Sequence, residues 1–102
     1  MDLNGRQISI YEIFDMVKQH IKYLFENNKL EGLDFEPTSF LLYGSRSKGL
    51  RTIREDSDID ILMEYIGTSR EDDVFNVFHY NENILFIEGV PVDINPKKII
   101  IT

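Results

Sequence analysis

Apolar positions near the N-terminus recur at the spacing of a helix. Ser9 and Glu12 match the signature of an N-terminal capping box, and Ile8 and Ile13 stand where a hydrophobic staple would flank it. The pattern predicts a helix over residues 10–27, because its apolar positions fall on one helical face. These positions are Ile10, Ile13, Phe14, Val17, Ile21 and Leu24.

Three later apolar runs predict β-strands. They span residues 39–43, 59–65 and 90–94, and the first follows a break at Glu36-Pro37. Each run is short enough for a strand and is bounded by polar or turn-forming residues, so each is expected to be buried in a sheet.

The stretch between the second and third runs is ambiguous. Ser69 with Asp72 can cap a short helix through residues 74–78, and the alternation over residues 74–80 also fits a strand. Residues 84–90, with Glu88-Gly89 at the turn, predict a hairpin. The order of elements predicts an α/β or α+β fold, with a small mixed β-sheet flanked by helices.

Composition adds the class of protein. The chain has 102 residues, of which 42% are hydrophobic and 28% charged, and it has no cysteine. We therefore expect a single domain over residues 1–102, without disulfides. No apolar run is long enough for a membrane span, and no signal peptide is evident at the start, so a cytoplasmic location is expected.

Charge is distributed unevenly along the chain. The net charge is −7, but residues 44–60 contain Arg46, Lys48, Arg51 and Arg54, followed by a cluster of acidic residues. An acidic protein is repelled by a nucleic-acid backbone, so nucleic acid is disfavoured as the main partner. An isolated basic patch suits a small phosphate ligand better than it suits a long polyanion.

Gly44-Ser45 is a candidate phosphate site, because it follows a predicted buried strand. Free backbone N–H groups at such a turn bind phosphate, and Arg46 and Lys48 are close enough in sequence to steady its oxygens. The alternatives are a simple strand-to-helix turn capped by Ser45, and surface salt bridges for the two cations. Tyr43 next to Gly44 allows either a core role or stacking on a base.

Asp58 and Asp60 are the candidate metal ligands. Two residues apart in a strand, they would point to one face about 7 Å apart at Cα, while Ile59 and Ile61 face the core. Carboxylate pairs of this kind suit Mg²⁺. The alternative is a solvated acidic loop. An EF-hand starting at Asp56 is excluded, because its sixth and twelfth positions would be Ile61 and Gly67.

Asp93 is the candidate third carboxylate. Val90, Val92 and Ile94 share one face of their predicted strand, which leaves Asp93 on the other. An unpaired carboxylate in a buried strand is costly, so either a functional role or a salt bridge to the nearby Lys97 or Lys98 would account for it. For His79 the sequence offers no partner that would make a metal site.

Taken together, these residues resemble the nucleotidyltransferase-fold superfamily (DNA polymerase β-like), especially its minimal nucleotidyltransferase (MNT) domains. The matching motif is Gly44-Ser45, then Ser57-Asp58-Ile59-Asp60, and later the isolated Asp93, within residues 39–95. Twelve residues separate Ser45 from Asp58, more than in many minimal members. The extra length falls in the loop between the motifs.

The resemblance implies a function and a site. Gly44 and Ser45 would hold a nucleoside triphosphate, with ATP the first choice. Asp58 and Asp60 would coordinate two Mg²⁺ ions, and Asp93 would complete the site. The implied reaction is transfer of AMP from ATP to a hydroxyl acceptor, which can be a partner protein.

Two alternatives remain beside this enzyme. One is the antitoxin of a toxin–antitoxin pair, which acts by binding a small helical (HEPN-type) partner. The other is a degenerate domain that binds the nucleotide without turnover.

Overall fold

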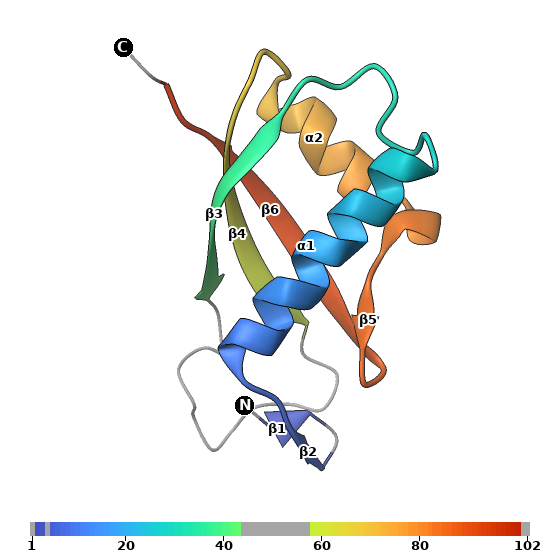
Figure 1. The fold of residues 1–102 in the computed structure, drawn as a ribbon, viewed down its shortest axis with the longest axis vertical. Helices are drawn as coiled ribbons and strands as arrows, with labels where there is room; N and C mark the ends of the chain where they lie inside the picture. Colours follow the sequence, from blue (N-terminus) through green and yellow to red (C-terminus); the bar gives the residue numbers. More distant parts are fainter. Residues whose placement is uncertain (1, 4, 44–57, 101–102) are drawn as a thin grey trace.

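A computed structural model describes residues 2–3, 5–43 and 58–100 of the chain (Figure 1). The Gly44-Ser45 turn and the basic stretch after it lie outside the described residues. The elements, in chain order, are β1 (Asp2–Leu3), β2 (Arg6–Gln7), α1 (Ile10–Glu26), β3 (Glu36–Tyr43), β4 (Ile59–Ile66), α2 (Glu71–Phe78), a 3-10 turn (Asn81–Asn83), β5 (Phe86–Ile87) and β6 (Val90–Lys98).

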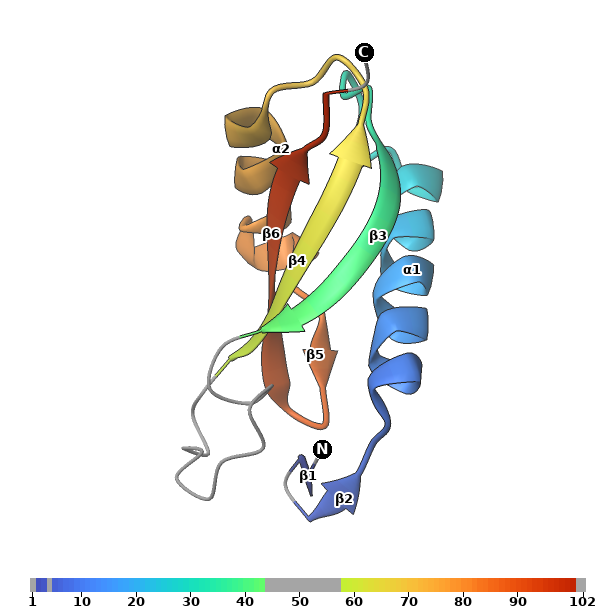
Figure 2. The same cartoon turned by 90° about the vertical axis from the view of Figure 1, so that its left-hand side faces the viewer.

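The main sheet has four strands in the order β3-β4-β6-β5. β4 and β6 are parallel, whereas the two outer pairs are antiparallel, so the sheet is mixed as predicted. Parallel neighbours need a crossover connection, and α2 lies within the one that joins β4 to β6. Figure 2 shows both helices behind the sheet, so that none of the described helices covers its front face.

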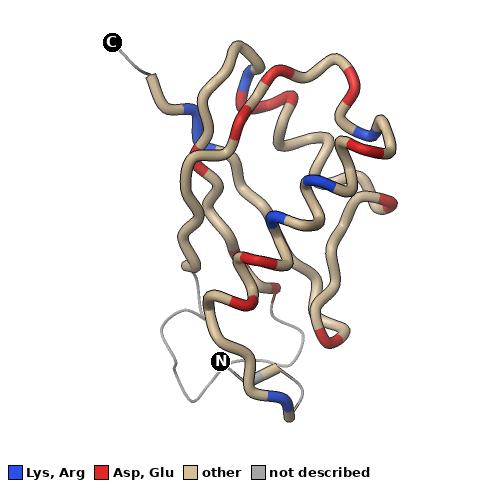
Figure 3. Tube along the Cα trace, viewed as in Figure 1, with Lys and Arg blue, Asp and Glu red and all other residues tan. Residues whose placement is uncertain are grey.

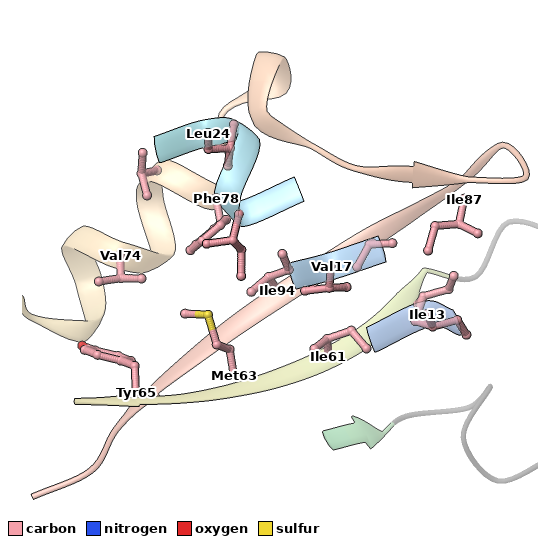
Figure 4. Packing of buried hydrophobic residues seen from close by; sticks show 14 of the residues in the cluster. Ile13, Val17, Leu24, Ile61, Met63, Tyr65, Val74, Phe78, Ile87 and Ile94 are labelled. Atoms are coloured by element: carbon pink, nitrogen blue, oxygen red, sulfur yellow. The ribbon is translucent and has the colours of Figure 1, made fainter. Parts of the chain in front are cut away.

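The core lies between the covered face of the sheet and the two helices. Side chains alternate along β4 between buried and partly exposed, as they must when successive residues point to opposite faces. Figure 4 shows buried side chains of the strands meeting those of both helices. The buried set includes Ile13, Val17, Ile21 and Leu24 of α1, Ile59, Ile61, Met63 and Tyr65 of β4, Val74 and Phe78 of α2, and Val92 and Ile94 of β6.

The first predicted helix is confirmed. The hydroxyl of Ser9 accepts a hydrogen bond of 3.1 Å from the backbone N–H of Glu12, which satisfies one of the free donors at the start of α1. Ile8 and Ile13 are both buried, as a hydrophobic staple requires. The helix ends at Glu26, and Asn28 then takes a positive φ of 60°.

β4 ends one residue later than predicted, at Ile66, and two other strands extend well beyond their predicted ranges. β3 begins at Glu36 instead of residue 39, because Pro37 is accommodated in a strand at the edge of the sheet, where the register shifts between Pro37 and Ser39. β6 continues beyond residue 94 to Lys98, and its Pro96 lies opposite Met63 of β4. The apolar run alone therefore underestimated both strands.

The ambiguous stretch is helical as far as Phe78, and the strand alternative for residues 74–80 is wrong. α2 runs over Glu71–Phe78, and its N-cap is Arg70, not Ser69. Ser69 instead accepts a hydrogen bond of 2.6 Å at its hydroxyl from the backbone N–H of Asp34, so it joins two loops. Three carboxylates in the first turn of α2 favour the helix through its dipole.

The predicted hairpin is confirmed, with a shorter first strand. Glu88 and Gly89 have φ values of 51° and 78°, the combination that a tight two-residue turn needs to match the twist of its strands. β5 has only two residues, and Phe86 pairs with Pro91 while Ile87 pairs with Val90. Beyond these two pairs, β6 packs against α2.

Acidic and basic positions are interspersed over the surface of the described chain. Figure 3 shows acidic positions along both helices and along the strands. No helix in the described ranges is long and apolar enough to cross a membrane.

Candidate active site

Asp60 and Asp93 are brought together by the pairing of β4 with β6. Their Cα atoms are partners in the register of the two parallel strands. The neighbouring partners Ile61 and Ile94 are buried in the core, so the two carboxylates project toward the opposite, open face. Two acidic residues more than thirty positions apart in sequence therefore lie side by side.

Two other carboxylates lie close enough to Asp60 to act on it. Its pKa is raised above the usual value of an aspartate, first by burial and then by the charges of Asp93 and Asp58. A hydrogen bond to Asp93 raises the pKa further. Like charges held this close favour the protonated form, or a cation that takes the place of the proton.

Asp58 lies just outside the strand. β4 begins at Ile59, so the prediction that Asp58 and Asp60 share a strand is wrong by one residue. Asp58 is exposed, yet its charge still acts on Asp60. The three predicted carboxylates are thus near one end of the parallel pair, with Asp58 the most exposed of them.

Tyr43 belongs to this face and not to the core. It is the last residue of β3, it lies opposite Asp60 in the antiparallel register, and 42% of its surface is exposed. Burial of its hydroxyl, together with the charges of Asp60 and Asp93, raises the pKa of Tyr43. Of the two roles that the sequence left open for it, the core role is wrong.

His79 is the site residue that sequence reasoning missed. Its Nε2 atom is in hydrogen-bond contact with the Oδ1 atom of Asp93, and both side chains are 29% exposed. The salt bridge from Asp93 to Lys97 or Lys98, considered from the sequence, is therefore replaced by a contact from the end of α2. Only the fourteen-residue separation of an Asp and a His was visible in the sequence, and that carries no signal.

The donor chemistry of the carboxylates fits Mg²⁺. Aspartate oxygens are the hard ligands that Mg²⁺ prefers, and the repulsion around Asp60 is the charge that a cation would neutralise. In the described ranges, however, no three His, Cys, Asp or Glu side chains converge closely enough to form a closed metal site. Asp60 and Asp93 form an adjacent pair with Asp58 nearby, which suits an ion that retains several water ligands.

Four predicted site residues, Gly44, Ser45, Arg46 and Lys48, lie outside the described residues. In the sequence they follow Tyr43, the last residue of β3. Binding of a triphosphate by this segment stays a prediction.

The fold and the carboxylate face together define a small α+β domain of the nucleotidyltransferase-like kind. A protein of Methanocaldococcus jannaschii named "Putative protein adenylyltransferase" is 34% identical to the chain over 96 residues, which cover 94% of this chain and 98% of that protein. The chain belongs to the same nucleotidyltransferase-like family as this archaeal protein, and the kinship supports nucleotidyl transfer in general. No family model matches the chain, and no solved structure matches it.

Proposed function

We propose that the protein is an Mg²⁺-dependent nucleotidyltransferase that moves AMP from ATP onto a hydroxyl group of a partner protein. The observation that carries this proposal is the pairing of Asp60 with Asp93 on adjacent parallel strands, on the face that the described helices leave open. The name of the archaeal relative, a protein adenylyltransferase, supports both the nucleotide and the protein acceptor. The same proposal includes the assignment of the chain to the minimal nucleotidyltransferase domains.

The carboxylates have a defined task in this reaction. Asp60 and Asp93, with Asp58 beside them, would hold Mg²⁺, and Gly44 and Ser45 would hold the triphosphate. Bound Mg²⁺ would neutralise the phosphate charge and ease ionisation of the acceptor hydroxyl. The protein's own contribution would be to hold the carboxylates together at one place on the sheet.

The bond changes balance without a further reactant. The acceptor oxygen forms a bond to the α-phosphorus of ATP, and the bond from that phosphorus to the bridging oxygen breaks. Pyrophosphate leaves with the electron pair. The proton of the acceptor passes to a nearby carboxylate, for which Asp93 is the candidate, and then to solvent.

The test is a transfer assay with matched variants. The protein is isolated from its native host with whatever binds it, and is then incubated with Mg²⁺ and ATP labelled at the α-phosphate. Asp60→Asn should remove the label from the acceptor, whereas Asp72→Asn, an exposed carboxylate at the start of α2, should leave it. Equal labelling by wild type and Asp60→Asn would refute the proposed chemistry.

A second candidate function is partner binding alone, as in an antitoxin that holds a small helical (HEPN-type) protein. The observation that favours it is the apolar surface on the open face, where Leu41 is 53% exposed and Tyr43 42% exposed. Co-purification of a short helical protein that gains no AMP would support this function. Thermal stabilisation by Mg-ATP without any transfer would instead indicate a degenerate nucleotide-binding domain.

A further inference from the structure

His79 is held in one orientation by contacts on three sides. It is the C-cap residue of α2, and its Nδ1 atom lies 2.7 Å from the backbone oxygen of Phe75. Its ring stacks on the ring of Phe75, with centroids 3.8 Å apart and planes 19° apart. The remaining ring nitrogen, Nε2, contacts the Oδ1 atom of Asp93.

The partners of the two ring nitrogens indicate which atoms carry hydrogen. A backbone carbonyl can only accept, so Nδ1 of His79 donates to Phe75. An ionised carboxylate also only accepts, so Nε2 must donate to Asp93 when Asp93 is ionised. When both nitrogens donate, the ring is an imidazolium, and its Nε2 atom faces one oxygen of Asp93 and leaves the other oxygen without this contact.

The contact from His79 affects whether the Asp93 carboxylate stays beside that of Asp60. The strand register places the two carboxylates side by side, and like charges at this separation repel each other. An aspartate side chain has two rotatable bonds, so without a second contact Asp93 would turn away from its neighbour. Donors that hold a metal-binding group in place commonly tune such sites.

We propose that His79 is a positioning residue that holds the Asp93 carboxylate beside Asp60, so that the pair can take a divalent cation. This inference rests on the proposed function, since it assigns the pair to a metal-dependent reaction. The simpler role, attachment of α2 to the sheet, is already served by Val74, Val77 and Phe78, which are buried in the core. Removal of the His79 donor should therefore leave the fold in place.

Two substitutions separate the donor from the ring. His79→Phe keeps a ring that can stack on Phe75 but has no donor for Asp93. His79→Gln loses the ring but keeps an N–H donor near the position of Nε2. The matched control is His20→Phe, because His20 lies on α1 with its Nε2 atom 2.6 Å from the backbone oxygen of Asn83, away from the carboxylates.

The primary readout is binding of Mn²⁺, as a probe for Mg²⁺, to the nucleotide-free protein by titration calorimetry. His79→Phe should weaken Mn²⁺ binding roughly tenfold to a hundredfold, as loss of such a supporting contact typically does. His79→Gln should recover most of that loss, and His20→Phe should bind as wild type does. In the transfer assay, His79→Phe should lower kcat and leave the KM for ATP nearly unchanged.

The outcomes distinguish the inference from the proposed function. If wild type binds Mn²⁺ and His79→Phe weakens binding while no transfer occurs, the positioning role stands and the transferase proposal fails. If His79→Phe melts near the wild-type temperature and binds Mn²⁺ as tightly as wild type, the positioning role is refuted. A wild-type protein that binds no Mn²⁺ refutes it as well.

Discussion

Asp60 and Asp93 show how the chain concentrates charge at single residues. Burial and two neighbouring carboxylates raise the pKa of Asp60, so its ionised form is held at a cost to the folded state. A protein selected only for stability would have no reason to keep three acidic side chains at one end of a parallel strand pair. The cost is the expected sign of a site that binds a cation or reacts.

Substitution of Asp60 should therefore stabilise the protein while it removes activity. Without added Mg²⁺ and near neutral pH, Asp60→Asn should raise the free energy of unfolding by up to about 1 kcal/mol, because it removes the repulsion with Asp93. Asp72→Asn should instead be neutral or slightly destabilising, since Asp72 lies in the first turn of α2 beside Arg70. Thermal unfolding of both variants gives the comparison, and a lower melting temperature for Asp60→Asn would contradict the charge argument.

Asp34 should make stability depend on pH in the opposite direction from Asp60, because the pKa of Asp34 is lowered and that of Asp60 is raised. Hydrogen bonds from the hydroxyl and then the backbone N–H of Thr68 lower the pKa of Asp34, and the charge of Lys98 adds to them. The stabilisation is therefore present above the unfolded value of about 3.9 and is lost as pH falls through the lower folded value.

The test is urea unfolding at about pH 7 and again at about pH 2. Asp34→Asn should be less stable than wild type at the higher pH, and the difference should shrink at the lower pH. Thr68→Ala removes one of the two bonds and keeps the charge, so its loss near neutral pH should be intermediate. A difference that is equal at both pH values would refute the assignment.

At the scale of elements, the sequence was informative where local signals agree. The capping residue Ser9 and the apolar spacing after it placed α1 to within a residue at each end. The start of β3 and the end of β6 were not predictable, because Pro37 and Pro96 are tolerated only through the strands' positions in the sheet.

The site residues also separate into those that a local pattern predicts and those that depend on the three-dimensional fold. Alternation along two apolar runs pointed to Asp60 and Asp93 as side chains that face away from the core, and the structure places them there. Their adjacency depends on the parallel register, which no local pattern specifies. The contact of His79 depends on where α2 ends relative to β6, so it could be found only in three dimensions.

The loop after β4 contains a close backbone contact at Gly67. Gly67 has a φ of 137°, and a Cβ atom there would lie 2.4 Å from the backbone oxygen of Asp34 and 2.8 Å from the Cα atom of Phe35. The segments at Asp34 and Ser69 are also joined by a backbone hydrogen bond of 3.0 Å. Close approach of two backbones therefore requires glycine at this position.

Gly67→Ala should accordingly destabilise the protein by at least about 2 kcal/mol, through the steric overlap and the unfavourable φ. Gly32→Ala is the matched control, because Gly32 has a φ of 86° and a Cβ atom there would have no neighbour within 4 Å. It should cost only the backbone strain, about 1 kcal/mol. Urea unfolding measures both, and equal losses would show that the close approach is not the cause.

For the molecule as a whole, charge limits the class of partner. The net charge of −7 opposes binding to the phosphate backbone of nucleic acid. The helices cover one face of the sheet, and the open face presents carboxylates beside exposed apolar side chains. This combination suits a metal-bound nucleotide together with a protein acceptor better than it suits a duplex.

Binding to duplex DNA should therefore be negligible. In fluorescence anisotropy at physiological salt, we expect no binding tighter than about 10⁻⁴ M, the weak end of non-specific interactions. A basic control protein of similar size confirms that the labelled duplex reports binding. Micromolar affinity that falls steeply with added salt would show that nucleic acid is a partner after all.

The most direct test of the proposed transfer is the mass of the co-purified partner after incubation with Mg-ATP. We expect the partner to gain one AMP with the wild-type protein and none with Asp60→Asn, while Asp72→Asn behaves as wild type. A partner whose mass stays unchanged with folded, Mg-ATP-supplied wild-type protein would contradict the transferase. Gain of AMP with Asp60→Asn would contradict the site.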